Sequence, residues 1–259
     1  MPPPAKGASL EEAQFYARHM VLTRDTFEAE CTTLATLEYS PHPNIVEVVD
    51  TQHPEGVYLK RYGRLPTAST LVERLGWYVD LLAALAHLHE LEIAHADLHP
   101  HNLLVDHDGH AMLCDFGTAM PFETSNFPDP NLCSPRNGFG EELNDASDRF
   151  GAASLIYWIE RGKEPAFIRT ASGWDLAELS TGEASLDAIS HHAWQGVYDT
   201  TLAMHDDLQK LRPERQQSSW TDDPAEKEQL KERIRLWREN RQRLYGIPNA
   251  PRKDRDQIR

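Results

Sequence analysis

The chain is 259 residues long and carries 41 acidic against 26 basic side chains, a formal net charge of −15, with 40% apolar residues. This length and composition predict a globular protein with one large domain or two lobes, and no apolar run approaches the roughly 18 residues that a membrane span requires. The negative charge disfavours nonspecific binding to nucleic acid or to anionic lipid, so we expect neither a nucleic-acid nor a membrane partner.

The cysteines and the start of the chain bear on the compartment. Cys31, Cys114 and Cys133 form no metal-binding or redox spacing, and their odd number favours free thiols. The first seven residues lack the basic-then-apolar pattern of a secretory signal. Both observations predict a reducing, intracellular location in the cytoplasm.

The N-terminal quarter of the chain predicts an arm, two strands and a helix. Residues 1–14 are rich in Pro and Ala, then acidic, and form the arm. A strand is expected over residues 15–22, and the apolar spacing that follows predicts a helix over residues 25–37. A further strand over residues 56–62 would place Lys60 on the same face as the two tyrosines beside it.

The middle of the chain is predicted to be mainly helical. Residues 69–90 carry apolar side chains at spacings of three and four, the pattern of an amphipathic helix that packs on a core. After an irregular stretch over residues 118–139, an almost wholly apolar helix starts at Asp148. Gly162 suits its left-handed C-cap, and residues 170–212 are expected to be helical with no recognisable chemistry.

The last helix has clear end signals. Asp223 is expected to be its N-cap, Pro224 its first residue, and Gly246 lies just past its end. Residues 224–259 hold eleven Lys and Arg against six Asp and Glu, so this segment is basic on an otherwise acidic chain. The segment could dock a partner protein or fold back on the body, and a solvated helix face is the alternative.

The most informative stretch runs from His95 to Leu104 and reads H-A-D-L-H-P-H-N-L-L, followed by D-F-G from Asp115. Asn102 comes five residues after Asp97, and Asp115 comes eighteen after it. Short apolar segments on either side of a polar turn predict a hairpin that returns Asn102 and Asp115 to the same end. Carboxylate and amide oxygens are the hard ligands that magnesium prefers.

This pattern resembles the catalytic loop and metal-binding turn of the protein-kinase family. The resemblance implies an α+β, two-lobed protein kinase-like fold. Its reduced N-terminal lobe would span residues 15–62 and its mainly helical C-terminal lobe residues 63–222. A C-terminal helix and basic tail would follow over residues 223–259. The resemblance also implies ATP and Mg as cofactors, in a reaction that depends on positioning and charge neutralisation.

The resemblance assigns roles to five residues of the large lobe. Asp97 would be the catalytic base that orients the substrate hydroxyl, and Asn102 and Asp115 would hold magnesium. His95 would belong to the catalytic loop and to the internal column of side chains that this family stacks through its core. Leu104 would contribute to the nucleotide site.

The small lobe departs from the family pattern. The glycine-rich turn is absent, and His19 stands in the slot of the family's phosphate-binding lysine, with Arg18 beside it. The glutamate that pairs with this cation is assigned to Glu30, with Glu28 as the competitor. Lys60 would face the back of the nucleotide pocket and either replace the missing lysine or block adenine; a solvated edge-strand lysine is the alternative.

Three further positions bear on function. Asp148 resembles the aspartate that ties down the catalytic-loop backbone in this family, whereas Arg136 stands where the family has a glutamate. His99 lies two residues after the base, where D-L-H looks more like the phosphotransferases that modify aminoglycosides or choline. The resemblance therefore implies a protein Ser/Thr kinase, with a pseudokinase that binds or scaffolds, or a phosphotransferase for a small-molecule hydroxyl, as the alternatives.

Overall fold

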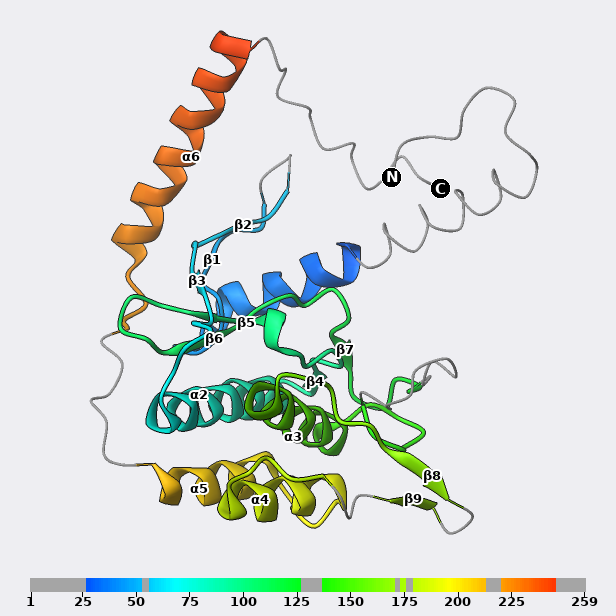
Figure 1. Cartoon of the computed structure of the whole chain (residues 1–259). Helices are drawn as coiled ribbons and strands as arrows, with labels where there is room; N and C mark the ends of the chain where they lie inside the picture. The colour runs from blue at the N-terminus through cyan, green and yellow to red at the C-terminus, as the bar shows by residue number, and fades with distance from the viewer. Residues whose placement is uncertain are drawn as a thin grey trace, which may run out of the picture.

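The structure is a computed structural model that describes residues 27–52, 56–126, 137–170, 173–175, 179–212 and 220–245. Figure 1 shows a small N-terminal part of one helix and short strands above a layered set of helices, with a long C-terminal helix standing to one side. The strand expected over residues 15–22 lies outside the described residues.

The N-terminal part consists of a helix over residues 27–39 and a two-stranded antiparallel sheet of β1 (Val48–Asp50) and β2 (Tyr58–Leu59). The single strand expected over residues 56–62 is wrong in extent. β2 pairs with β1 only at Tyr58 and Leu59, with an irregularity of register between the partners Val48 and Asp50. The chain then crosses to another sheet, where Gly63–Arg64 form β3.

That second sheet has the order β3-β5-β6 and contains the predicted hairpin. β5 (Leu103–Val105) pairs antiparallel with β6 (Ala111–Leu113), with Leu103 opposite Leu113. β3 pairs with the other edge of β5, and a further short pair joins β4 (Ile93–Ala94) to β7 (Met120–Pro121). The hairpin prediction is confirmed.

Two buried helices form the centre of the molecule. α2 (Leu71–Glu90) begins with a capping box at Thr70. α3 (Asp145–Arg161) begins with a capping box at Asn144, and its first residue lies three positions before the predicted start. Gly162 ends α3 with a φ of 69°, the left-handed C-cap that its position predicted. The largest fully buried side chains of the two helices lie against one another and against β6. They are Tyr78, Leu81, Leu82, Leu85, Leu88 and Leu155.

The expectation of an all-helical segment over residues 170–212 is wrong at its start. A hairpin of β8 (Ile168–Thr170) and β9 (Gly173–Asp175) precedes the helices, with Thr170 paired to Gly173 across the turn. The 3.6-residue periodicity begins only afterwards, in α4 (Ala184–Trp194) and α5 (Thr201–Leu211). These two helices pack under α2 and α3, as Figure 1 shows.

α6 (Pro224–Tyr245) has the start that the sequence predicted, since Asp223 Oδ1 accepts a hydrogen bond from the amide of Ala225 at 2.8 Å. The helix packs against β1. Glu226 at its first turn lies 3.1 Å from the Lys60 ammonium. In the described part of the chain, no helix has the length and apolar composition needed to cross a bilayer.

A carboxylate between α2 and α3 ties the central helices together. Glu160 accepts hydrogen bonds from Arg74 Nε at 2.7 Å, from Arg74 Nη2 at 2.8 Å and from the Tyr78 hydroxyl at 2.6 Å. Its side chain is 5% exposed, so water cannot replace these partners. Burial, and then the charge of Glu160, raise the pKa of Tyr78 far above its usual value.

We expect Glu160→Gln to lower the free energy of unfolding by about 2–4 kcal/mol, because it leaves the Arg74 charge without its bidentate partner. Urea denaturation followed by circular dichroism measures this. The control Glu239→Gln removes a carboxylate from a fully solvated pair with Arg235 on α6 and should leave the midpoint unchanged. Equal effects of the two substitutions would contradict this assignment.

Candidate active site

The segment from His95 to Asn102 lies between β4 and β5 and is held from below by a carboxylate of α3. Asp148 accepts hydrogen bonds from the backbone amides of His95, at 2.7 Å, and of Ala96, at 3.0 Å. His89 at the end of α2 lies 2.9 Å from the same carboxylate and 2.8 Å from the Thr201 hydroxyl. The aspartate therefore fixes the backbone of the loop, as the sequence predicted.

The electrostatics of this anchor favour the charged carboxylate. Burial alone would raise the pKa of Asp148, but the hydrogen bond and charge of His89 and the amide of Ala96 outweigh it, so the pKa lies below its usual value. The bonded amide of Ala96 belongs to a residue with a φ of 63°, a left-handed conformation that non-glycine residues seldom adopt. Such backbone persists only where surrounding contacts determine it.

His95 joins this loop to the D-F-G segment. Its Nε2 lies 3.1 Å from the carbonyl oxygen of Cys114, which can only accept, so Nε2 carries the proton. Nδ1 then accepts from the amide of Asp97 at 3.4 Å. The ring is fully buried and lies 5.4 Å from the ring of Phe116, and burial lowers its pKa. His95 thus packs and orients the loop as a neutral imidazole.

Asp97 and Asn102 lie together at the end of the loop. Asn102 Nδ2 donates to the carbonyl oxygen of Asp97 at 3.0 Å and to its carboxylate at 3.4 Å, which turns the amide oxygen of Asn102 the other way. Within the described ranges this oxygen accepts no hydrogen bond, although the residue is 4% exposed. An amide oxygen is one of the hard ligands that a divalent cation prefers, so Asn102 could hold one here.

Asp115 and Glu30 supply a second concentration of negative charge. Asp115 has a φ of 65°, and its carboxylate accepts only a long hydrogen bond, 3.4 Å, from the amide of Gly117 among the described contacts. Burial raises the pKa of Glu30, and the nearby charge of Asp115 raises it further. In the part of the chain that the structure describes, neither carboxylate pairs with Lys or Arg, so the site suits a divalent cation.

The hairpin is what brings these groups to one place. The amide of Cys114 donates to the carbonyl oxygen of Asn102 at 3.0 Å, directly before Asp115. Burial raises the pKa of the Cys114 thiol to about 12, with the charges of Asp115 and Glu30 adding to the effect. The thiol is therefore protonated at neutral pH and is no nucleophile.

The structure places the other predicted site residues apart from this cluster or leaves them undescribed. Arg18 and His19 lie outside the described residues. The ammonium of Lys60 bridges Glu47, at 3.2 Å, and Glu226, at 3.1 Å, so its role toward a nucleotide stays a prediction. Leu104 is half-buried in β5, and its predicted contact with the nucleotide likewise stays untested.

The sequence interpretation assigned no role to His89. In the structure it lies next to the buried carboxylate of Asp148. Its place four residues after the fully buried Leu85, on the same helix face, indicates that the ring needs a polar partner, although it does not reveal which one.

We expect Asp148→Asn to lower the free energy of unfolding at pH 7 by about 3 kcal/mol, since the amide cannot replace a carboxylate that accepts from several donors. The depressed pKa of Asp148 adds a pH dependence. The stabilisation is complete above the unfolded value of about 4 and is lost as the pH falls through the lower folded value. Urea unfolding should therefore show the gap between the two proteins narrowing below pH 4. A gap that does not change with pH would contradict this account.

Comparison with known proteins gives the family. The profile described as "Protein kinase domain" matches residues 12–172, more than half of the chain. The chain is 27% identical over 157 residues to the serine/threonine-protein kinase PrkC of Bacillus subtilis, which covers 54% of this chain and 24% of that protein. It is 37% identical over 92 residues to AtPK1/AtPK6 of Arabidopsis thaliana (33% and 20%) and 28% identical over 131 residues to VHS1 of Saccharomyces cerevisiae (51% and 25%), both described as serine/threonine-protein kinases.

The chain thus spans about a quarter or less of the length of these curated relatives. The matched range includes the loop from His95 to Asn102, the hairpin of β5 and β6, and α3. The family match and the candidate site therefore cover the same residues. With its helical C-terminal part and small sheets, the chain belongs to the protein kinase family and has its α+β fold.

Proposed function

We propose that the chain is an ATP- and magnesium-dependent protein kinase that phosphorylates Ser or Thr hydroxyls. The observation that carries the proposal is that the anchored loop and the hairpin bring Asp97, Asn102 and Asp115 together: Asn102 Nδ2 donates to Asp97, and the amide of Cys114, directly before Asp115, donates to the carbonyl oxygen of Asn102. The relatives described as serine/threonine-protein kinases support the substrate class.

Each residue has a role that its surroundings suit. Asp97, whose orientation is set by Asn102 and by the ring of His95, would accept the hydrogen bond of the attacking hydroxyl and hold that oxygen in line. Asn102 and Asp115 would hold magnesium, which neutralises phosphate charge when it is bound. Buried His95 keeps the two halves of the site at a fixed distance by bonding to both segments.

A pseudokinase that binds or scaffolds is the second candidate, and the contacts of Lys60 favour it. Its ammonium is shared between Glu47 and Glu226, and in the described contacts it pairs with neither Glu30 nor Asp115. Phosphorylation of a small molecule is the third candidate. It draws on His99, whose Nε2 lies 3.3 Å from the Asp97 carboxylate.

Two further parts of the proposal concern the surroundings of the enzyme. We propose an intracellular, cytoplasmic location for the protein, because Cys31 and Cys114 are free thiols. We also propose that α6 binds a partner protein, because the distal half of this basic helix exposes large apolar side chains. They are Leu236, Trp237 and Leu244.

Asp97→Asn should reduce phosphoryl transfer at least about 100-fold while leaving the fold and ATP binding intact, because the amide cannot accept the proton of the hydroxyl. The measurement is transfer of labelled γ-phosphate from ATP with magnesium to casein, histone and myelin basic protein, and in parallel to kanamycin and choline. Asp199→Asn, an exposed carboxylate before α5, is the matched control and should keep full activity.

The pattern of acceptors separates the candidates. Transfer to the proteins alone supports the protein kinase, and transfer to kanamycin or choline alone supports the third candidate. ATP binding without transfer to any acceptor, or wild-type activity of Asp97→Asn, would contradict the proposed function.

A further inference from the structure

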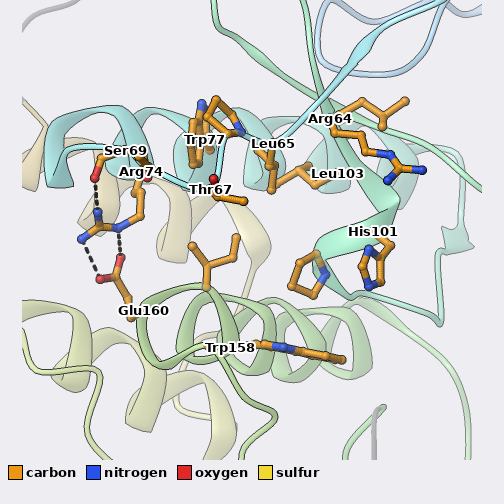
Figure 2. A pocket seen from close by; sticks show the side chains of 16 residues that line it. Arg64, Leu65, Thr67, Ser69, Arg74, Trp77, His101, Leu103, Trp158 and Glu160 are labelled. Carbon is orange, nitrogen blue, oxygen red and sulfur yellow. Dashed lines mark hydrogen bonds and ion pairs between the residues drawn. The ribbon is translucent and has the colours of Figure 1, made fainter.

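A large pocket lies beside the catalytic loop, and of the predicted site residues only Leu104 lines it. Its volume is about 990 Å³, the size of a pocket for a substantial organic group. It is lined by four separate segments: residues 64–69 from β3 to the start of α2, the first turns of α2, the turn and strand that contribute Pro100, His101, Leu103 and Leu104, and the end of α3. Figure 2 shows these segments surrounding it.

One end of the pocket has its polar groups already satisfied. Arg74 bonds to both carboxylate oxygens of Glu160 and to the carbonyl oxygen of Ser69, which is 2.8 Å from Nη1. The indole of Trp77 donates to the carbonyl oxygen of Gly109 at 3.1 Å. Glu160 accepts three hydrogen bonds, so it has little capacity left to attract a cationic ligand.

The walls between the two ends are apolar and partly aromatic. Trp77 comes from α2 and Trp158 from α3, and Leu65 and Leu103 lie between them in Figure 2. Rigid indole walls bind a side chain with little loss of conformational entropy. This region suits an aliphatic or aromatic group.

The other end of the pocket has hydrogen-bond donors that are not used. Arg64 is exposed on the edge strand β3, and its guanidinium has no ion pair or hydrogen bond within the described ranges. His101 is exposed, lies four residues beyond Asp97, and in Figure 2 its ring is on the same side of the pocket as Arg64. An unpaired arginine is notable on a chain of net charge −15.

We propose that this pocket binds the part of a polypeptide substrate next to the phosphorylated hydroxyl, and that it selects an Asp or Glu side chain adjoining an apolar one. The carboxylate would lie at Arg64 and His101, and the apolar side chain between the two indoles. The inference rests on the proposed function, because it assumes that the substrate Ser or Thr hydroxyl binds at Asp97. An arginine fork and a carboxylate match in charge and geometry, which gives the preference its chemical basis.

The test uses the full chain and labelled synthetic peptides, without nucleotide. Each peptide has a central Ser in a Leu and Ala background, and one flanking position at a time holds Glu, Gln or Lys. Fluorescence anisotropy measures the dissociation constants. We expect Glu at one or two positions to bind about three- to tenfold more tightly than Gln, and Lys to bind more weakly than either.

The variant Arg64→Glu should abolish the preference for Glu, and Arg64→Gln should reduce it. The matched control is Arg61→Glu, which makes the same charge change at an exposed residue that does not line the pocket. It should keep the preference. Circular dichroism of each variant checks that the fold is retained.

The outcomes separate this inference from the proposed function. Equal binding of Glu and Gln peptides, no peptide binding, preference for Lys, or the same loss in Arg61→Glu and Arg64→Glu would each overturn the inference. ATP binding, measured separately, tests the kinase proposal. A protein that prefers Glu peptides but binds no ATP would support the peptide-binding pocket and contradict the proposed kinase activity.

Discussion

A buried carboxylate at the start of a helix holds the active-site loop in position. Asp148 lies on α3, is 1% exposed, and accepts the amides of His95 and Ala96 while facing His89 of α2. A carboxylate in this setting is costly unless donors surround it, so the loop backbone must turn both amides toward it. The left-handed conformation of Ala96 is part of this arrangement, since it belongs to one of the two bonded amides.

The loop connects two functional parts of the molecule, the predicted magnesium ligands on one side and the large pocket on the other. On one side the hairpin register sets Leu103 opposite Leu113, so Asn102 and Asp115 leave its open end together. On the other side the turn at Pro100–Asn102 borders the large pocket, whose far end is closed by the pair of Arg74 and Glu160. The same short segment therefore connects a cluster of oxygen ligands with a surface that can recognise a substrate.

The sequence predicted the elements whose signals are local, and it failed where distant contacts decide. The hairpin and the start of α6 were predicted correctly, because turn residues and capping residues act within a few positions. The strand over residues 56–62 was too long, since the chain pairs with β1 only at Tyr58 and Leu59 and joins a different sheet at Gly63. The roles of His89 and Lys60 depend on Asp148 and Glu226, which are 59 and 166 residues away, and no local pattern reveals such partners.

The most direct test of the account is calorimetric titration of ATP into the chain with and without magnesium, for the wild type and for Asp115→Asn. The account predicts binding only with magnesium, with a dissociation constant between about 1 μM and 1 mM, and weakening of about tenfold or more in the variant. Absence of binding in both proteins, or equal binding with and without the carboxylate, would contradict the assignment of Asp97, Asn102 and Asp115 as a phosphoryl-transfer site.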